Sequence, residues 1–172
     1  MKSFFKGNRK SKGKDRKMQA KDWNYQESQK AILPMPVNQS AFTHARTLYV
    51  KCRDLNEISE RHLQELSDAI FKMFGLQTVP VRFAGKQPVK NTRNGYVKTL
   101  GVNRRNFLTN TIQIYKLTGK RGQVRKPKAS VETLLHEIVH TLDIALCKLN
   151  DSIHSAGFYK RISQLKDMLF QS

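Results

Sequence analysis

The chain has 172 residues, a length that favours one domain with a tail over two domains. Its 32 Lys and Arg residues outnumber 13 Asp and Glu residues, which gives a formal net charge of +19. Such a charge favours a nucleic acid or another anionic surface as partner, with a merely basic, ribosome-like protein as the alternative. Only two cysteines are present, Cys52 and Cys147, which excludes a disulfide framework and a four-cysteine zinc ribbon.

The same composition bears on location. No apolar run approaches the length of a membrane span, and the basic N-terminus lacks the apolar core of a signal peptide. Sparse cysteines are typical of a reducing compartment. We therefore expect a soluble, cytoplasmic protein with no membrane partner, and leave association with a nucleoid or a nucleus open.

The first 44 residues divide into two parts. Residues 1–24 carry nine Lys or Arg and two Asp, a net charge of 9 − 2 = +7, and predict a disordered basic arm. The arm either follows DNA or serves as a targeting or solubility tail. Residues 25–44 contain Pro34 and Pro36, which disfavour helix, and predict a linker or a segment that wraps the domain. The folded domain is expected over residues 45–172.

The domain is expected to open with a core helix that ends near residue 74. Apolar residues recur at roughly helical spacing up to Phe74. Asp54 and Glu57 fit a capping pair at a helix start, and Gly75 is a natural stop.

After residue 75 the composition becomes typical of β-strands. Three stretches rich in β-branched and aromatic residues, 79–85, 95–102 and 106–117, predict three short antiparallel strands. After a loop over residues 118–129, Ser130 is a suitable N-cap for a helix that runs to about Leu149. A last helix is expected over about 155–170. The chain thus predicts an α+β fold with an N-terminal core helix, a small antiparallel sheet, and two further helices.

The excess charge is concentrated beside the last two helices. Between Ala69 and Val131 there is no Asp or Glu. The same stretch holds 14 basic residues, namely Lys72, Arg82, Lys86, Lys90, Arg93, Lys98, Arg104, Arg105, Lys116, Lys120, Arg121, Arg125, Lys126 and Lys128. For a nucleic-acid contact we single out Arg104, Arg105, Lys120, Arg121, Arg125, Lys126 and Lys128.

The sharpest motif is HEIVH, residues 136–140, inside the first of these helices. Residues four apart lie one turn apart on the same helix face, so His136 and His140 can both face one ion. Neutral imidazoles are ligands that zinc prefers. Glu137 is then near enough to take a proton from water activated by the metal and to pass it to a leaving amine. Zn²⁺ is therefore the expected cofactor, and Glu137 the expected general base and acid.

A catalytic zinc site needs a third protein ligand and an open position. His154 can supply that ligand if the chain turns back after the helix. Asp143 shares the helix face of the two histidines and is the competitor. It is either a carboxylate ligand, a group that bonds a ligand imidazole, or an ordinary solvent-facing residue.

These residues resemble a known family. HEIVH followed by HSAGFYKRI, residues 154–162, is similar to the SprT-like zinc metallopeptidases, which include the Spartan-type DNA–protein crosslink proteases. That family has His-Glu-x-x-His and then His-Gly-x-x-Phe; His154 and Phe158 match, while Ser155 stands where the family has glycine. NTIQIYKL, residues 110–117, resembles the strand before the active helix. The resemblance implies His136, His140 and His154 as zinc ligands and DNA held near the catalytic face.

The sequence therefore predicts a zinc-dependent metalloprotease that acts on DNA-associated or DNA-crosslinked proteins. Lys and Arg side chains bind DNA through its phosphates, independently of its sequence. Binding to DNA would therefore explain the high positive charge, which proteolysis alone does not require. The main alternative is a basic nucleic-acid-binding protein with a structural or vestigial zinc site. A peptidase unrelated to DNA is a third.

Overall fold

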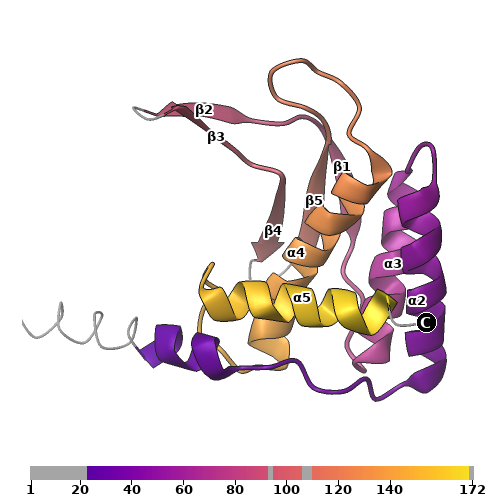
Figure 1. The fold of residues 1–172 in the computed structure, drawn as a ribbon, viewed down its shortest axis with the longest axis vertical. Coiled ribbons are helices and arrows are strands. Elements are labelled where there is room, and N and C mark those ends of the chain that lie inside the picture. Colours follow the sequence, from indigo (N-terminus) through magenta and orange to yellow (C-terminus); the bar gives the residue numbers. More distant parts are fainter. Residues whose placement is uncertain (1–22, 93–94, 106–109, 171–172) are drawn as a thin grey trace, which may run out of the picture.

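The computed structural model describes residues 23–92, 95–105 and 110–170 of the chain. Helices and a small sheet form an α+β fold, as predicted (Figure 1). Residues 1–22 of the predicted basic arm lie outside the described part, whereas its last two residues, 23 and 24, belong to a helix rather than to a disordered segment.

Two helices occupy the region where one core helix was expected. α2 spans Gln39–Asp54 and α3 spans Glu60–Met73. The predicted capping pair is wrong, because Asp54 ends α2 and Glu57 lies between the helices. The true cap of α3 is Ser59, which accepts from His62 N while the His62 ring accepts from Ser59 N. This reciprocal cap satisfies two helix-start donors and makes a new helix start there favourable.

The sheet has three strands, as predicted, but it is mixed rather than antiparallel. β5 (Asn110–Leu117) lies in the centre, with β1 (Val81–Lys86) parallel on one side and β4 (Gly101–Arg105) antiparallel on the other. The predicted strand 95–102 is divided between β3 and β4. β2 (Val89–Thr92) and β3 (Gly95–Lys98) form a separate ribbon that extends away from the sheet (Figure 1). β2, β3 and β4 lie between β1 and β5 in the sequence. This long connection lets β5 return in the same direction as β1 and pair with it in parallel.

The last two helices bring the site together. α4 covers Pro127–Ala145 and begins three residues before the predicted cap at Ser130. Pro127 is at the first helical position, where its fixed φ suits the helix and its lack of an N–H leaves no donor unpaired. No side chain caps this end of the helix. α5 covers Ala156–Phe170, which confirms the predicted closing helix. α4 packs against α2, α5, β4 and β5, and its apolar face is buried in the core with Val131, Leu134, Leu135, Ile138 and Leu142.

The segment before α2 packs against the rest of the domain. Residues 23–30 are helical and lie beside the start of α5 (Figure 1). Leu33 is 2% exposed and belongs to the core, and both of its backbone polar groups bond the Gln164 side chain. The ordered fold thus begins well before residue 45.

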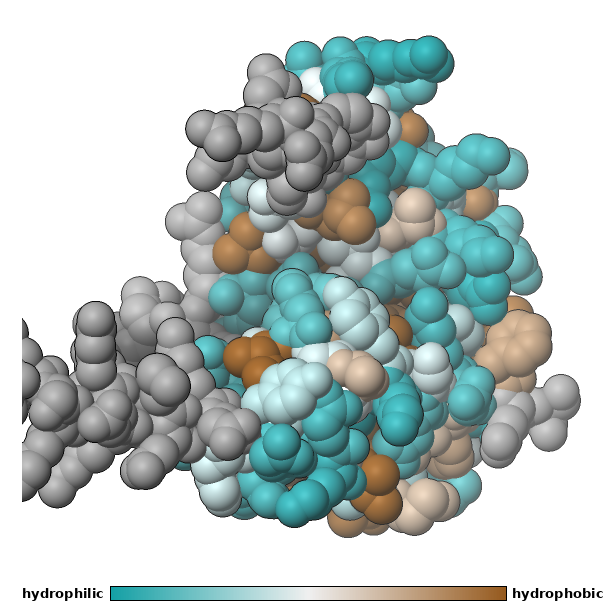
Figure 2. All heavy atoms as spheres, turned by 60° about the vertical axis from the view of Figure 1, so that its left-hand side comes forward, coloured by the Kyte–Doolittle hydropathy of each residue, from teal (hydrophilic) through white to brown (hydrophobic). Residues whose placement is uncertain are grey.

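One face of the molecule is mainly polar. Figure 2 shows a face dominated by hydrophilic residues, with hydrophobic ones in small, separate patches. Among the described residues, no helix has the length and apolar character needed to cross a bilayer.

Candidate metal centre

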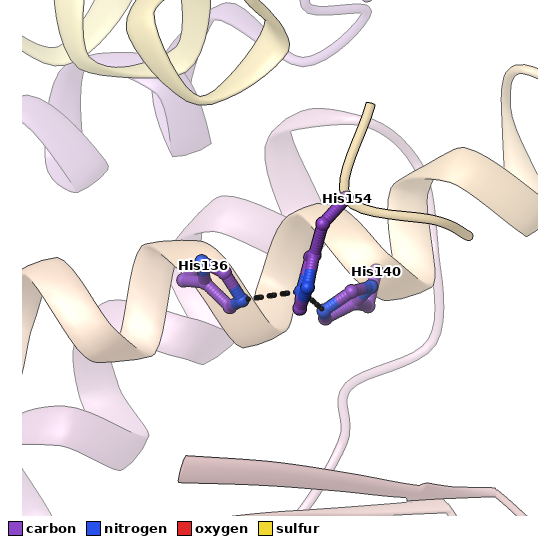
Figure 3. A group of neighbouring side chains, drawn as sticks. All are labelled: His136, His140 and His154. Atoms are coloured by element: carbon purple, nitrogen blue, oxygen red, sulfur yellow. Dashed lines mark hydrogen bonds between the residues drawn. The ribbon is translucent and has the colours of Figure 1, made fainter. Parts of the chain in front are cut away.

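Three histidine rings converge where α4 meets the loop before α5. His136 and His140 lie one turn apart on α4, and His154 descends from the loop between them (Figure 3). The His154 Nε2 atom lies 3.0 Å from Nε2 of His136 and 3.0 Å from Nε2 of His140. The structure thus brings together all three histidines that the sequence singled out as ligands.

This donor set fits a metal ion. Three ligand nitrogens at 2.0–2.1 Å from a tetrahedral ion lie about 3.3 Å apart. The two separations from His154 are each 3.0 Å, and all three ligand atoms lie within 4.8 Å of one another. The three atoms form a group that can hold one ion, and one coordination position is left for another molecule. Among the described residues, no fourth His, Cys, Asp or Glu joins this group.

An aromatic ring lies against the three histidines, and His136 is partly buried beside it. The Phe158 ring lies 5.0, 4.5 and 5.1 Å from the His136, His140 and His154 rings, centroid to centroid. Burial, together with the charge of His154, lowers the pKa of His136 to about 4. His136 is therefore neutral at physiological pH, as a metal ligand must be.

His140 is oriented from behind by a chain of hydrogen bonds. Its Nδ1 atom lies 2.8 Å from Ser152 Oγ, and Ser152 Oγ donates to Asp143 Oδ2 at 2.7 Å. Since Asp143 pairs with a guanidinium and only accepts, the serine proton goes to Asp143. Ser152 then accepts from His140 Nδ1–H, which leaves the Nε2 lone pair free for a metal.

Asp143 therefore supports a ligand rather than being one. It is 0% exposed, and Arg161, 1% exposed, donates to both of its carboxylate oxygens at 2.6 and 2.9 Å. Of the three roles considered for Asp143, the structure favours support of a ligand imidazole, acting through Ser152. Neither Ser152 nor Arg161 was predicted to be part of the site. The sequence could have indicated Arg161, because it falls on the apolar face of α5, where a charged residue needs a buried partner.

Glu137 lies on the other side of the rings, against strand β4. It is 5% exposed, and burial raises the pKa of its carboxyl to about 7, although a hydrogen bond from the Asn103 backbone opposes the shift. A Cβ atom on Gly101 would lie 2.8 Å from Glu137 Oε1, so glycine on β4 makes room for the carboxyl. The Asn103 side chain donates to the Glu137 carbonyl at 2.8 Å and to Thr141 Oγ1 at 2.7 Å, which joins β4 to α4.

The three histidines and Glu137 open into one cleft of about 740 Å³ between β4 and α4. The residues that line it are Thr99, Leu100, Gly101, Val102, Asn103, Arg125, Ala129, Glu132, Thr133, His136, Glu137, His140, Ser152 and His154. β4 is the edge of its sheet, and none of the described strands pairs with its outer side. The cleft therefore offers backbone groups beside the three rings.

Of the seven basic residues predicted to contact nucleic acid, the structure describes the side chains of five. Lys120, Arg121, Lys126 and Lys128 are exposed on the loop before α4 and on its first turn. The side chains of Arg104 and Arg105, on β4, lie outside the described part.

Arg125 differs from the other basic residues. Its guanidinium donates to Thr133 Oγ1 at 2.8 Å, Ala129 O at 3.1 Å and Leu100 O at 3.2 Å, and burial lowers its pKa. These bonds join the loop before α4, and the residue directly before β4, to α4. Arg125 is therefore part of the cleft wall rather than of the exposed basic surface.

Comparison with known proteins adds no relative: no family model, no curated protein and no solved structure matches this chain. The likeness to the SprT-like metallopeptidases accordingly stays a prediction that rests on the residues themselves.

Proposed function

We propose that this protein is a zinc-dependent endopeptidase of the SprT-like kind, acting on proteins associated with or crosslinked to DNA. The observation that carries the proposal is the convergence of three imidazole nitrogens beside a buried carboxyl, in an open cleft. His136, His140 and His154 would hold the ion, and Glu137 would be the general base and acid.

The chemistry follows from the residues around the cleft. A zinc ion held by the three histidines would lower the pKa of water and polarise a carbonyl group. Glu137, with a pKa of about 7, is poised to take a proton from the attacking water and give it to the departing amine. Proton transfer of this kind contributes about 10²–10⁴-fold to rates.

The cleft favours a polypeptide as substrate. The free edge of β4 can pair with an extended chain through backbone hydrogen bonds, which do not depend on the substrate's side chains. Pairing along a strand edge engages the backbone within a chain and needs no chain terminus, which agrees with cleavage within a chain rather than trimming from an end.

The DNA part of the proposal rests on charge. The protein carries +19, and Lys120, Arg121, Lys126 and Lys128 are exposed beside the helix that bears the site. Side chains of this kind release counterions from phosphates, so the affinity for DNA should fall steeply with salt. A substrate protein bound to the same DNA would be held near the cleft.

Glu137→Gln tests the proteolytic activity. The variant should bind zinc as the wild type does and should lose about 10²–10⁴-fold in cleavage of a basic protein substrate. Zinc content and cleavage should be measured together, with and without single-stranded DNA. Equal cleavage by the variant and the wild type would remove the proposal.

The charge alone also favours a second function, that of a nucleic-acid-binding protein with a structural or vestigial zinc site. It predicts salt-sensitive DNA binding and bound zinc, but no cleavage under any DNA condition. Cleavage without measurable affinity for DNA would instead indicate a peptidase unrelated to DNA.

A further inference from the structure

The segment over residues 23–31 contacts the loop that carries His154. Asn24 is 5% exposed, and its Oδ1 atom accepts from Asn150 N at 2.9 Å and from Asp151 N at 3.2 Å. Its Nδ2 atom donates to Asp151 O at 2.8 Å. One side chain thus holds the backbone directly before Ser152 and three residues before His154.

The same segment holds the chain on the other side of His154. Ser28 Oγ lies 2.7 Å from Ser155 Oγ, and Gln29 Oε1 accepts from Gly157 N at 3.1 Å. A Cβ atom at position 157 would overlap the Ser28 carbonyl, so only glycine permits this approach. The loop of the third histidine is therefore held before and after that residue.

A third connection reaches His140. Arg161 Nη1 donates to Ser28 O at 2.6 Å and to Ala31 O at 3.1 Å, while the rest of its guanidinium binds Asp143. Asp143 in turn orients His140 through Ser152. The backbone of residues 23–31 therefore completes the buried network behind a second histidine.

We propose that residues 23–31 are a clamp that sets the metal affinity of the histidine centre, with Asn24 as a positioning residue for His154. His136 and His140 are held by a helix, but His154 lies on a loop, and a free loop would lose conformational entropy on binding an ion. Hydrogen-bonded partners behind metal ligands typically change affinity 10–100-fold. This inference rests on the proposed function in one respect, that the three histidines bind a metal.

The test is the zinc affinity of the full chain, measured by competition with a chromophoric chelator, for the wild type and three variants. Asn24→Ala removes all three bonds to residues 150 and 151, and Gln29→Ala removes only the bond to Gly157. Gln164→Ala is the matched control. The Gln164 amide also makes paired backbone bonds to this wrapping chain, at Leu33, but none to the loop of His154.

We expect Asn24→Ala to weaken zinc binding 10–100-fold, Gln29→Ala to weaken it less, and Gln164→Ala to leave it within twofold of the wild type. The cobalt(II) absorption spectrum should change in the same order, which loss of stability alone would not cause. Gln29→Ala carries the test if Asn24→Ala does not fold.

Wild-type affinity in both clamp variants overturns the clamp and leaves the proposed function intact. An equal loss in Gln164→Ala also overturns it, because the effect would then be general. A wild-type chain that binds no zinc overturns both proposals.

Discussion

Two regions of this molecule are built differently. We call them the metal side, which is the three histidines and the groups behind them, and the basic side, which is Lys120, Arg121, Lys126 and Lys128. Around the three histidines, rings and supporting groups are held by buried partners, down to a carboxylate that is 0% exposed. The Lys and Arg residues on the loop before α4 and on its first turn have exposed side chains instead. Metal chemistry needs ligands in place beforehand, whereas phosphate neutralisation needs charge and little geometry. Single substitutions should therefore have large effects on stability or metal affinity on the metal side, and small, additive effects on DNA affinity on the basic side.

The largest effect is expected from Asp143→Ala. It leaves the Arg161 guanidinium buried without its anion, which should lower the free energy of unfolding by about 3–5 kcal/mol. Urea denaturation measures this. The control is Glu65→Ala, which breaks a pair whose side chains are 41% and 85% exposed and should cost less than about 1 kcal/mol. Equal losses in the two variants would show that the Asp143 network is no more important than a surface pair.

Glu137→Gln should change how the stability of the metal-free protein depends on pH. The Glu137 carboxyl has a pKa of about 7 in the folded chain against 4.5 as the ordinary value. Between these values the folded state binds more protons than the unfolded one, so stability falls as pH rises through this window. Relative to wild type, the variant should therefore gain about 3 kcal/mol between pH 4.5 and pH 8.

His136 acts in the opposite direction. Its pKa of about 4 lies below the ordinary 6.5, so it contributes stability that is lost as pH falls through this range. Since His136 is present in both proteins, subtracting the two stability curves isolates Glu137. A pH-independent difference would mean that the carboxyl is not held in its buried position.

Ser152→Ala should weaken metal binding more than it weakens the fold. It removes the group that joins the His140 ring to Asp143, and a 10–100-fold loss of zinc affinity is expected. The exposed Ser163 on α5 supplies the control, and Ser163→Ala should leave zinc affinity unchanged. The role of Ser152 fails if both alanine variants bind zinc as the wild type does.

The smallest effects are expected on the basic side. Arg121→Ala, Lys126→Ala and Lys128→Ala should each reduce the slope of log affinity against log salt for duplex DNA by about 0.9. Cleavage of a free peptide should not change. Lys51→Ala, on α2, is the control and should leave the slope alone. If the salt dependence of DNA affinity is unchanged in these three variants, the DNA contact lies elsewhere on the molecule.

The fold was predictable where a local pattern decides it. NTIQIYKL is strand β5, and α5 begins within one residue of its predicted start. The break between α2 and α3 was missed because apolar residues, Leu55 and Ile58, continue through it. The parallel pairing of β1 with β5 was missed because alternation of side chains is the same in either direction.

The site divides in the same way. The spacing of HEIVH places two histidines on one helix face, and local periodicity is enough to show it. The support behind them joins α4, the loop before α5 and residues 23–31, so it depends on contacts between distant parts of the chain. Asn24, for example, bonds residues 150 and 151, and no local pattern connects such positions.

The central claim is that His136, His140 and His154 together bind one zinc ion. X-ray absorption at the zinc edge of the zinc-loaded wild-type protein tests it directly. We predict one zinc per chain with three imidazole nitrogens at about 2.0–2.1 Å and one oxygen ligand from water, and the loss of one imidazole in His154→Ala. A sulfur neighbour at about 2.3 Å, or an unchanged spectrum in His154→Ala, would contradict the account.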